Sequence, residues 1–328
     1  MSKVAVIGAG AWGTTLSILL AEREHAVTLW IYEEEIARGM KVNRENRTFL
    51  PGFPIPENIE PTSDPAAVSE AELLFFVVPT QFSRSVAKKL AQYIKPSAIV
   101  VSAAKGVEHN TLKLPLQILE EELGGRPLCA LSGPNLASEI ARGLPAATVV
   151  AGLEEKNAMK VQEMLMLPRF RVYTNNDIVG VQLGGSLKNV IAISAGIVKG
   201  LSLGDNALAA MIVRGIAEMT RLGTALGARA ETFHGLSGSG DLIVTCSSEL
   251  SRNHQVGEQI AKGKKLPEIL SGMKEVAEGV ATAPAVVSLA KSYNVKMPIA
   301  QEVYNILYQH KNPYQALIEL MTRTPTNE

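Results

Sequence analysis

The chain has 328 residues and 46% of them are hydrophobic, so it can bury a large core and is long enough for two domains. Its 32 basic residues balance 32 acidic ones, which argues against a general attraction to nucleic acid or to an anionic membrane surface. Cys129 and Cys246 lie far apart and in no metal-ligand pattern, so we expect neither a disulfide framework nor a metal site. Because the N-terminus also lacks the regions of a signal peptide, we expect a cytoplasmic protein.

Short apolar runs alternate with longer amphipathic runs through the first half, which is typical of βα units around a mainly parallel sheet. Strands are predicted at 3–7, 26–30, 73–78, 98–102, 128–131, 148–151 and 170–173, and helices at 13–24, 82–92 and 154–167. The strand runs are apolar with little alternation, so helices should cover both faces of the sheet. The first half is therefore predicted to be a Rossmann-type α/β domain.

The second half carries apolar residues at helical spacing and no strand signal, so we expect it to be all-helical. The boundary is expected at the polar turn Asn175-Asn176-Asp177, which would divide a dinucleotide-binding domain at 1–176 from a helical substrate-binding and catalytic domain at 177–328. Charged residues interrupt the apolar stretch 181–227, which predicts buried helices and no membrane span.

The segment Gly8-Ala9-Gly10-Ala11-Trp12-Gly13 matches the G-x-G-x-x-G pattern of dinucleotide-binding turns, between a predicted strand and a predicted helix. Gly8 permits the tight turn, Gly10 lets the backbone approach a pyrophosphate, and Gly13 lets helix and strand pack closely. The helix N-terminus would supply free N–H groups to the anion. A glycine-rich turn without a ligand is the alternative, but the position behind a strand favours a dinucleotide.

The choice between NAD and NADP depends on the residues after the second predicted strand. An acid that binds the adenine ribose is expected about 20 positions beyond the glycines, and Glu33 comes slightly late, behind Tyr32. If Glu33 does not reach the ribose, Tyr32 or a nearby arginine (Arg38, Arg44 or Arg47) could accept a 2′-phosphate, although these charges also suit a solvated helix face. We expect NADPH or NADH, with NADPH favoured.

Two loops after predicted strands place polar residues at the carboxyl edge of the sheet, where ligands bind in open α/β folds. Lys105, in Ser102-Ala103-Ala104-Lys105-Gly106, is one candidate, and an ordinary exposed lysine is the alternative. In Ser132-Gly133-Pro134-Asn135, Pro134 makes the loop rigid and Asn135 could cap the helix that follows.

Lys188 follows the diglycine Gly184-Gly185, which we expect to open the first long helix of the second half. The neighbours of Lys188 are apolar, so its amine should be partly desolvated, which lowers the pKa of a lysine toward the range useful for proton transfer. The glycines would let another chain or a cofactor come close. A lysine that extends to solvent from the helix edge is the alternative.

Three glycines precede Asp241 in a predicted tight loop, and Asp241 could orient an ammonium group, bond a substrate hydroxyl or only cap a helix. Ser251-Arg252-Asn253 offers a hydroxyl, a guanidinium and an amide, which suit a phosphate dianion if they begin a helix. A solvated helix start is the alternative. Cys246 near His254 is expected to be an inert thiol, because no other acid or base has a fixed relation to them.

Taken in order, these motifs resemble the bacterial NAD(P)-dependent glycerol-3-phosphate dehydrogenases nearly from end to end. The matching segments are Gly8 to Thr14, Ala104-Lys105-Gly106, Ser132-Gly133-Pro134, Val181 to Gly185 with Lys188 to Ala192, Gly240-Asp241-Leu242 and Ser251-Arg252-Asn253. The resemblance implies reversible, NAD(P)H-dependent reduction of dihydroxyacetone phosphate to sn-glycerol 3-phosphate, which supplies glycerophospholipid synthesis.

The resemblance also implies the roles of individual residues. Lys188 would be the proton acceptor in alcohol oxidation, with Lys105 and Asp241 beside the reacting carbon. The substrate would be held by these three residues and by Gly133, Asn135, Ser251, Arg252 and Asn253. The dinucleotide would be lined by Gly8, Gly10, Ala11, Trp12, Gly13, Tyr32, Lys105, Ala137, Arg252, Val276 and Glu278.

The chain departs from the family pattern at Asn135, where threonine or serine is more frequent, and at Ala104, where threonine is frequent. These departures leave open the hydrogen bonds near the hydroxymethyl end of the substrate. A related 3-hydroxyacid or sugar-acid dehydrogenase is the second hypothesis, and a dinucleotide-sensing module without activity is the third. A homodimer is expected, because so apolar a helical domain often has surface left to cover.

Overall fold

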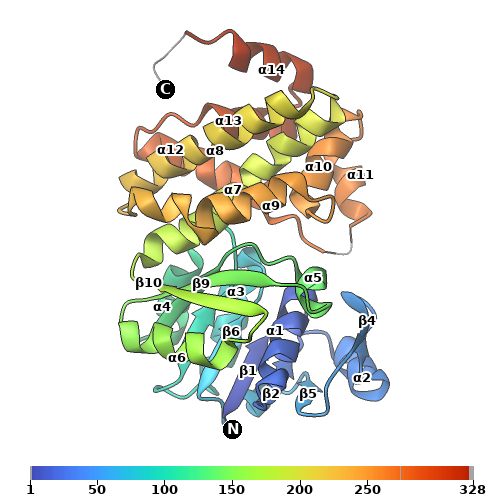
Figure 1. Cartoon of the computed structure of the whole chain (residues 1–328), viewed down its shortest axis with the longest axis vertical. Coiled ribbons are helices and arrows are strands. Elements are labelled where there is room, and N and C mark those ends of the chain that lie inside the picture. The colour runs from blue at the N-terminus through green and yellow to red at the C-terminus, as the bar shows by residue number, and fades with distance from the viewer. Residues whose placement is uncertain (1, 274, 325–328) are drawn as a thin grey trace.

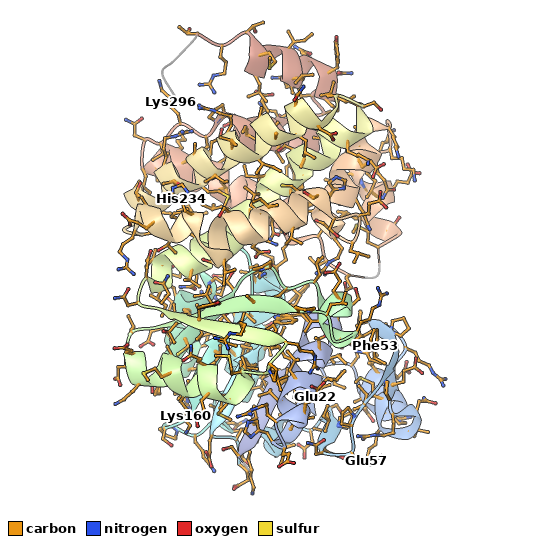
Figure 2. All side chains as sticks on the ribbon, in the orientation of Figure 1. Glu22, Phe53, Glu57, Lys160, His234 and Lys296 are labelled. Atoms are coloured by element: carbon orange, nitrogen blue, oxygen red, sulfur yellow. The ribbon has the colours of Figure 1, made fainter. Side chains whose placement is uncertain are left out.

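The computed structural model describes residues 2–273 and 275–324. An eight-stranded sheet with its helices forms one unit, and a group of helices stacks on it as a second unit (Figure 1). The labelled side chains of Glu22 and Lys160 lie on the sheet unit, and those of His234 and Lys296 lie on the helical unit (Figure 2). The predicted fold class, a Rossmann-type domain followed by an all-helical one, is confirmed.

The sheet unit contains every predicted strand and helix, with ends displaced by at most two residues. Its main-sheet strands are β1 (Lys3–Ile7), β2 (Ala26–Trp30), β5 (Ile59–Thr62), β6 (Leu73–Phe76), β7 (Ile99–Ser102), β8 (Leu128–Ser132), β9 (Ala146–Gly152) and β10 (Phe170–Asn175). Its helices are α1 (Ala11–Glu22), α2 (Glu34–Asn43), η1 (Pro65–Val68), α3 (Thr80–Leu90), α4 (Pro115–Leu123), α5 (Ala137–Ala141) and α6 (Glu155–Leu165).

The strand order is β10-β9-β8-β7-β6-β1-β2-β5. β1 pairs in parallel with both β2 and β6, so the direction in which successive strands are added to the sheet reverses at β1. Ligands of such sheets bind beyond the carboxyl ends of the strands at this point. β9 runs antiparallel to β8 but parallel to β10, so the last two strands oppose the other six. The sheet is mainly parallel, as predicted.

Three strands between β2 and β6 were not expected from the sequence. β3 (Glu45–Asn46) and β4 (Leu50–Pro54) form a small antiparallel hairpin, and β5 joins the main sheet at its edge. Pro51, Pro54 and Pro61 obscure the strand pattern in β4 and β5. Proline cannot donate a ladder hydrogen bond, so it is tolerated at such edges and argues against a strand elsewhere.

Both faces of the sheet are buried. Along β1, Val4 and Val6 belong to the apolar cluster that includes Leu16 of α1, whereas Ala5 and Ile7 belong to the cluster on the opposite face. Each of these β1 side chains is at most 1% exposed. Burial on two sides explains why the strand runs are apolar without alternation.

The helical unit is built around α7 (Ile178–Gly200), which packs against α8 (Asp205–Ala225), α9 (Asp241–Ser247), α10 (Arg252–Ala261) and α12 (Glu278–Ser292). Its other elements are η2 (Ala230–His234), the π-helical turn η3 (Leu236–Gly240), α11 (Leu266–Ser271), α13 (Pro298–Tyr308) and α14 (Pro313–Met321). By length and composition α7 could span a membrane, but 89% of its apolar window is buried inside the protein. It is the core helix of this unit.

α7 begins directly after the polar turn that follows β10. Asp177 caps it, since one carboxylate oxygen accepts the N–H of Gly180 at 2.8 Å, and the other accepts the hydroxyl of Thr232 at 2.6 Å. Gly184 and Gly185 are therefore the seventh and eighth residues of the helix, and the expectation that they open it is wrong. The cap at Asp177 extends the helix back to the sheet, whereas the division into domains at this turn stays a prediction.

Candidate active site

The glycine-rich turn joins β1 to α1 at the carboxyl edge of the sheet. Gly8 has a φ of +104°, and a Cβ on Gly13 would lie 1.9 Å from the Gly8 oxygen, so turn and helix pack this closely only with glycine at both positions. A Cβ on Gly10 would meet only Glu275 Oε1, at 3.9 Å. The space over Gly10, at the N-terminus of α1, thus fits the diphosphate of a dinucleotide.

A buried ionic cluster joins the two units. Asp241, the first residue of α9, is 1% exposed and accepts hydrogen bonds of 2.7 Å from Lys188 Nζ of α7 and from Lys105 Nζ after β7. Lys188 also donates to Thr245 Oγ1 at 2.6 Å, and Lys105 donates to the Gly133 oxygen at 2.9 Å. The structure therefore brings together the three residues predicted to surround the reacting carbon.

The surroundings of Lys188 lower the pKa of its amine. Burial lowers the pKa of Lys188 to about 8, with the charge of Lys105 acting in the same direction and the carboxylate of Asp241 opposing both. An ammonium group has three N–H bonds, and within the described residues two of them have acceptors. The third can donate to a ligand, so this amine can give or take a proton near neutral pH.

The diglycine of α7 lets segments of the same chain approach the helix. A Cβ on Gly184 would lie 2.4 Å from a main-chain oxygen of η3, and one on Gly185 would lie 2.5 Å from Ser132 Oγ. The side chain of Lys105 passes over Gly185, and its main-chain oxygen accepts the amide of Asn189 at 2.8 Å. These contacts hold Lys105 against the helix that carries Lys188.

Ser251-Arg252-Asn253 lies at the start of α10, which is the condition under which these residues suit a phosphate. The Ser251 hydroxyl caps the helix by accepting a first-turn N–H at 3.2 Å, and the main-chain N–H groups of the next two residues have no partner within the helix. The amide of Asn253 donates to Asn189 at 2.9 Å and accepts from the Gly279 N–H at 2.9 Å. This amide therefore joins three helices, and the Arg252 guanidinium and the helix N-terminus are the groups suited to an anion.

Asn135 does not cap the helix that follows, so that expectation is wrong. The N-cap residue of α5 is Leu136, and the Asn135 amide instead donates to Thr148 Oγ1 of β9 at 3.0 Å. Gly133, with a φ of +147°, lets the loop run close to β9, since a Cβ at this position would lie 3.0 Å from Thr148 Cα. Asn135 Oδ1 is buried and has no partner in the described parts of the chain, so it can accept from a ligand.

The remaining positions that the family resemblance assigns to the dinucleotide surround the same edge. Trp12 lies in α1 with its buried Nε1 unpartnered among the described atoms, and Ala137 begins α5 beside α1. Val276 is 41% exposed in the loop before α12. The carboxylate of Glu278 accepts the N–H of Thr80 at 2.9 Å, at the start of α3.

The residues considered for a 2′-phosphate differ in their surroundings. Arg44 donates to three main-chain oxygens around the start of β5 and so stabilises that connection. Arg38 and Arg47 make exposed ion pairs with neighbouring glutamates. Tyr32 is 64% exposed, and Lys89 Nζ lies 5.1 Å from its ring centre. The guanidinium of Arg44 is thus engaged with the main chain, whereas the side chains of Arg38 and Arg47 are exposed.

Thiol and metal chemistry have little support at this site. Burial raises the pKa of Cys246 to about 12, so the thiol stays protonated. Across residues 2–273 and 275–324, no group of three or more histidine, cysteine, aspartate or glutamate side chains could hold a metal ion. The chemistry of the described cluster is that of amines and a carboxylate.

Comparisons with known proteins agree on one family. Models of the NAD-dependent glycerol-3-phosphate dehydrogenase N-terminus and C-terminus match residues 3–158 and 177–318. The chain is 50% identical over 325 residues to the glycerol-3-phosphate dehydrogenase (NAD(P)+) of Citrifermentans bemidjiense, covering 98% of this chain and 97% of that one. The chain belongs to the NAD-dependent glycerol-3-phosphate dehydrogenase family.

Relatives in this glycerol-3-phosphate dehydrogenase family also share the arrangement of both units. The crystal structure of the glycerol-3-phosphate dehydrogenase from Coxiella burnetii has a TM-score of 0.95 and 36% identity, covering 98% of this chain and 99% of that one. The enzyme of that name from Solidesulfovibrio magneticus is 46% identical over 329 residues, 99% of this chain and 100% of that one.

Several site residues of this family member were not singled out from the sequence. Thr245 could have been found, because it lies four residues after Asp241 and therefore on the same face of α9. Asn46 donates to the Ala9 oxygen and to Thr14 Oγ1, at 2.8 Å each, and so stabilises the glycine-rich turn. Glu275 reaches that turn from a distant loop, and no local pattern marks it.

Proposed function

We propose that this protein reversibly reduces dihydroxyacetone phosphate to sn-glycerol 3-phosphate, with NADPH or NADH as the hydride donor. The observation that carries the proposal is the buried cluster of Lys188, Asp241 and Lys105, at the edge of a sheet whose glycine-rich turn fits a dinucleotide. Membership of the glycerol-3-phosphate dehydrogenase family over both units supports the same reaction.

The dinucleotide, when bound, supplies a hydride to the carbonyl carbon of the substrate. Lys188 in its ammonium form donates a proton to the carbonyl oxygen as negative charge develops there. Lys105 adds positive potential to the same region, and Asp241 orients both amines through its two 2.7 Å hydrogen bonds. In the oxidative direction the neutral amine of Lys188 takes the proton of the alcohol.

The substrate phosphate is proposed to bind at the N-terminus of α10. There the free N–H groups of the first turn, the Ser251 hydroxyl and the Arg252 guanidinium can bind a dianion together. Asn253 contributes its main-chain N–H, because its amide is engaged with α7 and α12. Gly133 and Asn135 complete the proposed substrate contacts. Binding the phosphate away from the reacting carbon fixes the position of the carbonyl.

The wider assignment follows from these roles. We propose that residues 1–176 form the dinucleotide-binding domain and that residues 177–328 form the helical substrate-binding and catalytic domain. The first domain would contact the dinucleotide through Gly8, Gly10, Ala11, Trp12, Gly13, Tyr32, Lys105 and Ala137. The helical domain would add Arg252, Val276 and Glu278. We also propose a cytoplasmic homodimer whose product enters glycerophospholipid synthesis. Light scattering of the purified protein at several concentrations would test the dimer.

The deciding experiment follows the absorbance of reduced nicotinamide with purified protein, dihydroxyacetone phosphate and either NADPH or NADH. We expect cofactor oxidation that depends on the phosphorylated ketone and yields sn-glycerol 3-phosphate. Consumption with a carboxylate semialdehyde instead would identify a 3-hydroxyacid dehydrogenase. Tight NADPH binding without turnover of either substrate would favour a dinucleotide-sensing module and count against the proposal.

A further inference from the structure

A carboxylate of the protein itself lies over the glycine-rich turn. Glu275 Oε1 accepts the main-chain N–H of Ala11, the first residue of α1, at 3.2 Å. The same oxygen is the atom that a Cβ on Gly10 would meet, at 3.9 Å. Helix N-termini attract anions through their free N–H groups and their dipole. Glu275 therefore occupies the position that the glycine-rich turn offers to a diphosphate.

The other oxygen of this carboxylate pairs with Arg252. Glu275 Oε2 lies 3.2 Å from Arg252 Nη1, and the same nitrogen donates to the main-chain oxygen of Val276 at 3.2 Å. The side chains of Glu275 and Arg252 are 24% and 46% exposed, so the ion pair is partly open to water. One carboxylate thus engages two groups that both suit a phosphorylated ligand.

Two anions cannot share this place. A bound diphosphate would meet the carboxylate at the N-terminus of α1, where close like charges repel each other. Glu275 must therefore leave the turn when a dinucleotide enters, and its departure breaks the contact with Arg252. When only a fraction of the protein is in the state that can bind a ligand, the apparent affinity for that ligand is reduced by that fraction. The carboxylate of Glu275, while it lies over the turn, therefore reduces the affinity for the dinucleotide.

We propose that Glu275 competes with the dinucleotide diphosphate for the glycine-rich turn. Glu275 releases Arg252 for the substrate phosphate only when the cofactor displaces Glu275 from the turn. The inference rests on the proposed function, because it takes the glycine-rich turn as the cofactor site and Arg252 as a phosphate ligand. Cofactor and substrate are coupled through this one side chain, and thermodynamic linkage makes the coupling equal in both directions.

The surroundings give the loop an anchor and room to move. Glu278, three residues further on, is tied to Thr80 at the start of α3 by hydrogen bonds of 2.9 and 3.2 Å. A crevice of about 500 Å³ lies beside Glu275 and Arg252, between α10 and α11, and Lys264 lines it. The carboxylate can swing into this crevice while the start of α12 stays in place.

The test compares Glu275→Gln with wild type by titrating NADH, ADP-ribose and glycerol 3-phosphate into the intact enzyme. Glutamine keeps the size of the side chain but removes its charge. A hydrogen bond to a charged group contributes more than a neutral one, so we expect Glu275→Gln to bind NADH and ADP-ribose about 3- to 10-fold more tightly. Without cofactor, Glu275→Gln should also bind glycerol 3-phosphate more tightly than wild type does. The increase in affinity for glycerol 3-phosphate on adding NADH should be smaller in the variant by a similar factor.

Glu268→Gln is the matched control, because Glu268 lines the same crevice, is exposed and makes no hydrogen bond to the turn within the described residues. We expect it to bind all three ligands as wild type does. Unchanged or weaker NADH binding by Glu275→Gln would overturn the inference, as would an equal gain in Glu268→Gln. Failure of the wild type to bind NADH would instead contradict the proposed function, so the two failures are distinguishable.

Discussion

Lys188 is the residue on which the proposed proton transfer depends. It combines three properties that a general acid requires: burial, a pKa lowered to about 8 and an N–H that remains free for a ligand in the described structure. Asp241 keeps the amine in one place, and Lys105 shares that carboxylate on its other oxygen. The cluster is therefore a positioned proton donor in a positive field.

Lys188→Ala should lower turnover of dihydroxyacetone phosphate by about 100-fold or more, because the proton donor to the developing alkoxide is lost. Asp241 keeps Lys105 as its partner in this variant, so the fold should remain intact. Steady-state kinetics and the unfolding midpoint check both statements. Lys199→Ala, at an exposed position in the last turn of the same helix, is the matched control and should keep wild-type turnover. Near-normal turnover by a folded Lys188→Ala enzyme would refute the role.

The lowered pKa of Lys188 predicts opposite pH profiles for the two directions. Reduction needs the ammonium form, so kcat/KM for dihydroxyacetone phosphate should be level below the pKa of about 8 and fall above it. Oxidation of glycerol 3-phosphate needs the neutral amine, so it should rise through the same pH and level off. Asp241→Asn removes an attraction that raises the pKa, and both profiles should shift to lower pH. If reduction and oxidation both rose, or both fell, as the pH passes about 8, this assignment would be contradicted.

At the scale of elements, glycines decide how closely helices approach their neighbours. Gly13 lets α1 pack on the turn after β1, and Gly185 lets α7 pack on the end of β8 and on Lys105. In an isolated helix two consecutive glycines would be unfavourable, but in α7 the contacts with the sheet unit offset this cost. The helix that carries Lys188 is therefore held against the loop that carries Lys105.

Gly10→Ala and Gly13→Ala should separate ligand binding from folding. A Cβ at position 10 meets only a flexible carboxylate, so Gly10→Ala should fold with stability close to wild type but bind NADH at least about 10-fold more weakly, since the methyl group takes space from the diphosphate. A Cβ at position 13 would collide with the Gly8 oxygen, which should lower the free energy of unfolding by about 1–3 kcal/mol or more. Urea unfolding and NADH titration of both variants test the contrast, and equal stabilities would contradict it.

At the scale of the whole molecule, polar groups at helix ends link distant parts of the chain. Glu278 of α12 holds the start of α3, and thereby joins the helical unit to the sheet unit. Glu218 of α8 accepts the main-chain N–H groups of Ile299 and Ala300 at 2.7 and 3.2 Å, in the first turn of α13. Glu218 is 1% exposed, and burial raises its pKa to about 7 despite these two bonds.

The raised pKa of Glu218 predicts that global stability depends on pH. The folded protein holds this proton more tightly than the unfolded chain, so the resulting stabilisation is complete below the ordinary pKa and is lost as pH rises through about 7. The loss should reach about 3 kcal/mol, because one pKa unit corresponds to about 1.4 kcal/mol. The glutamine of Glu218→Gln does not titrate. The free energy of unfolding of this variant in urea, relative to that of the wild type, should therefore rise by roughly 2–3 kcal/mol between pH 5 and pH 8.5. Parallel curves would show that Glu218 does not control this dependence.

Much of the fold could be predicted because its determinants are local. The strands of the sheet follow from apolar runs bounded by turn residues, and the β1–α1 turn follows from glycines whose conformations only glycine adopts readily. The edge strand β5 could not be predicted, because Pro61 interrupts its pattern and only pairing with β2 makes it a strand. The start of α7 was misplaced, because the cap at Asp177 outweighs the local preference of two glycines against helix.

The sequence by itself determined the fold class, the cofactor turn and the lysine on a buried helix, since hydrophobic spacing and glycine chemistry act over a few residues. The tertiary structure alone decided which groups meet. Lys188 and Asp241 are 53 positions apart, Lys105 and Asp241 are 136 apart, and Ala11 and Glu275 are 264 apart. Such contacts depend on how the helical unit packs against the sheet edge, and no local pattern in the chain encodes that packing.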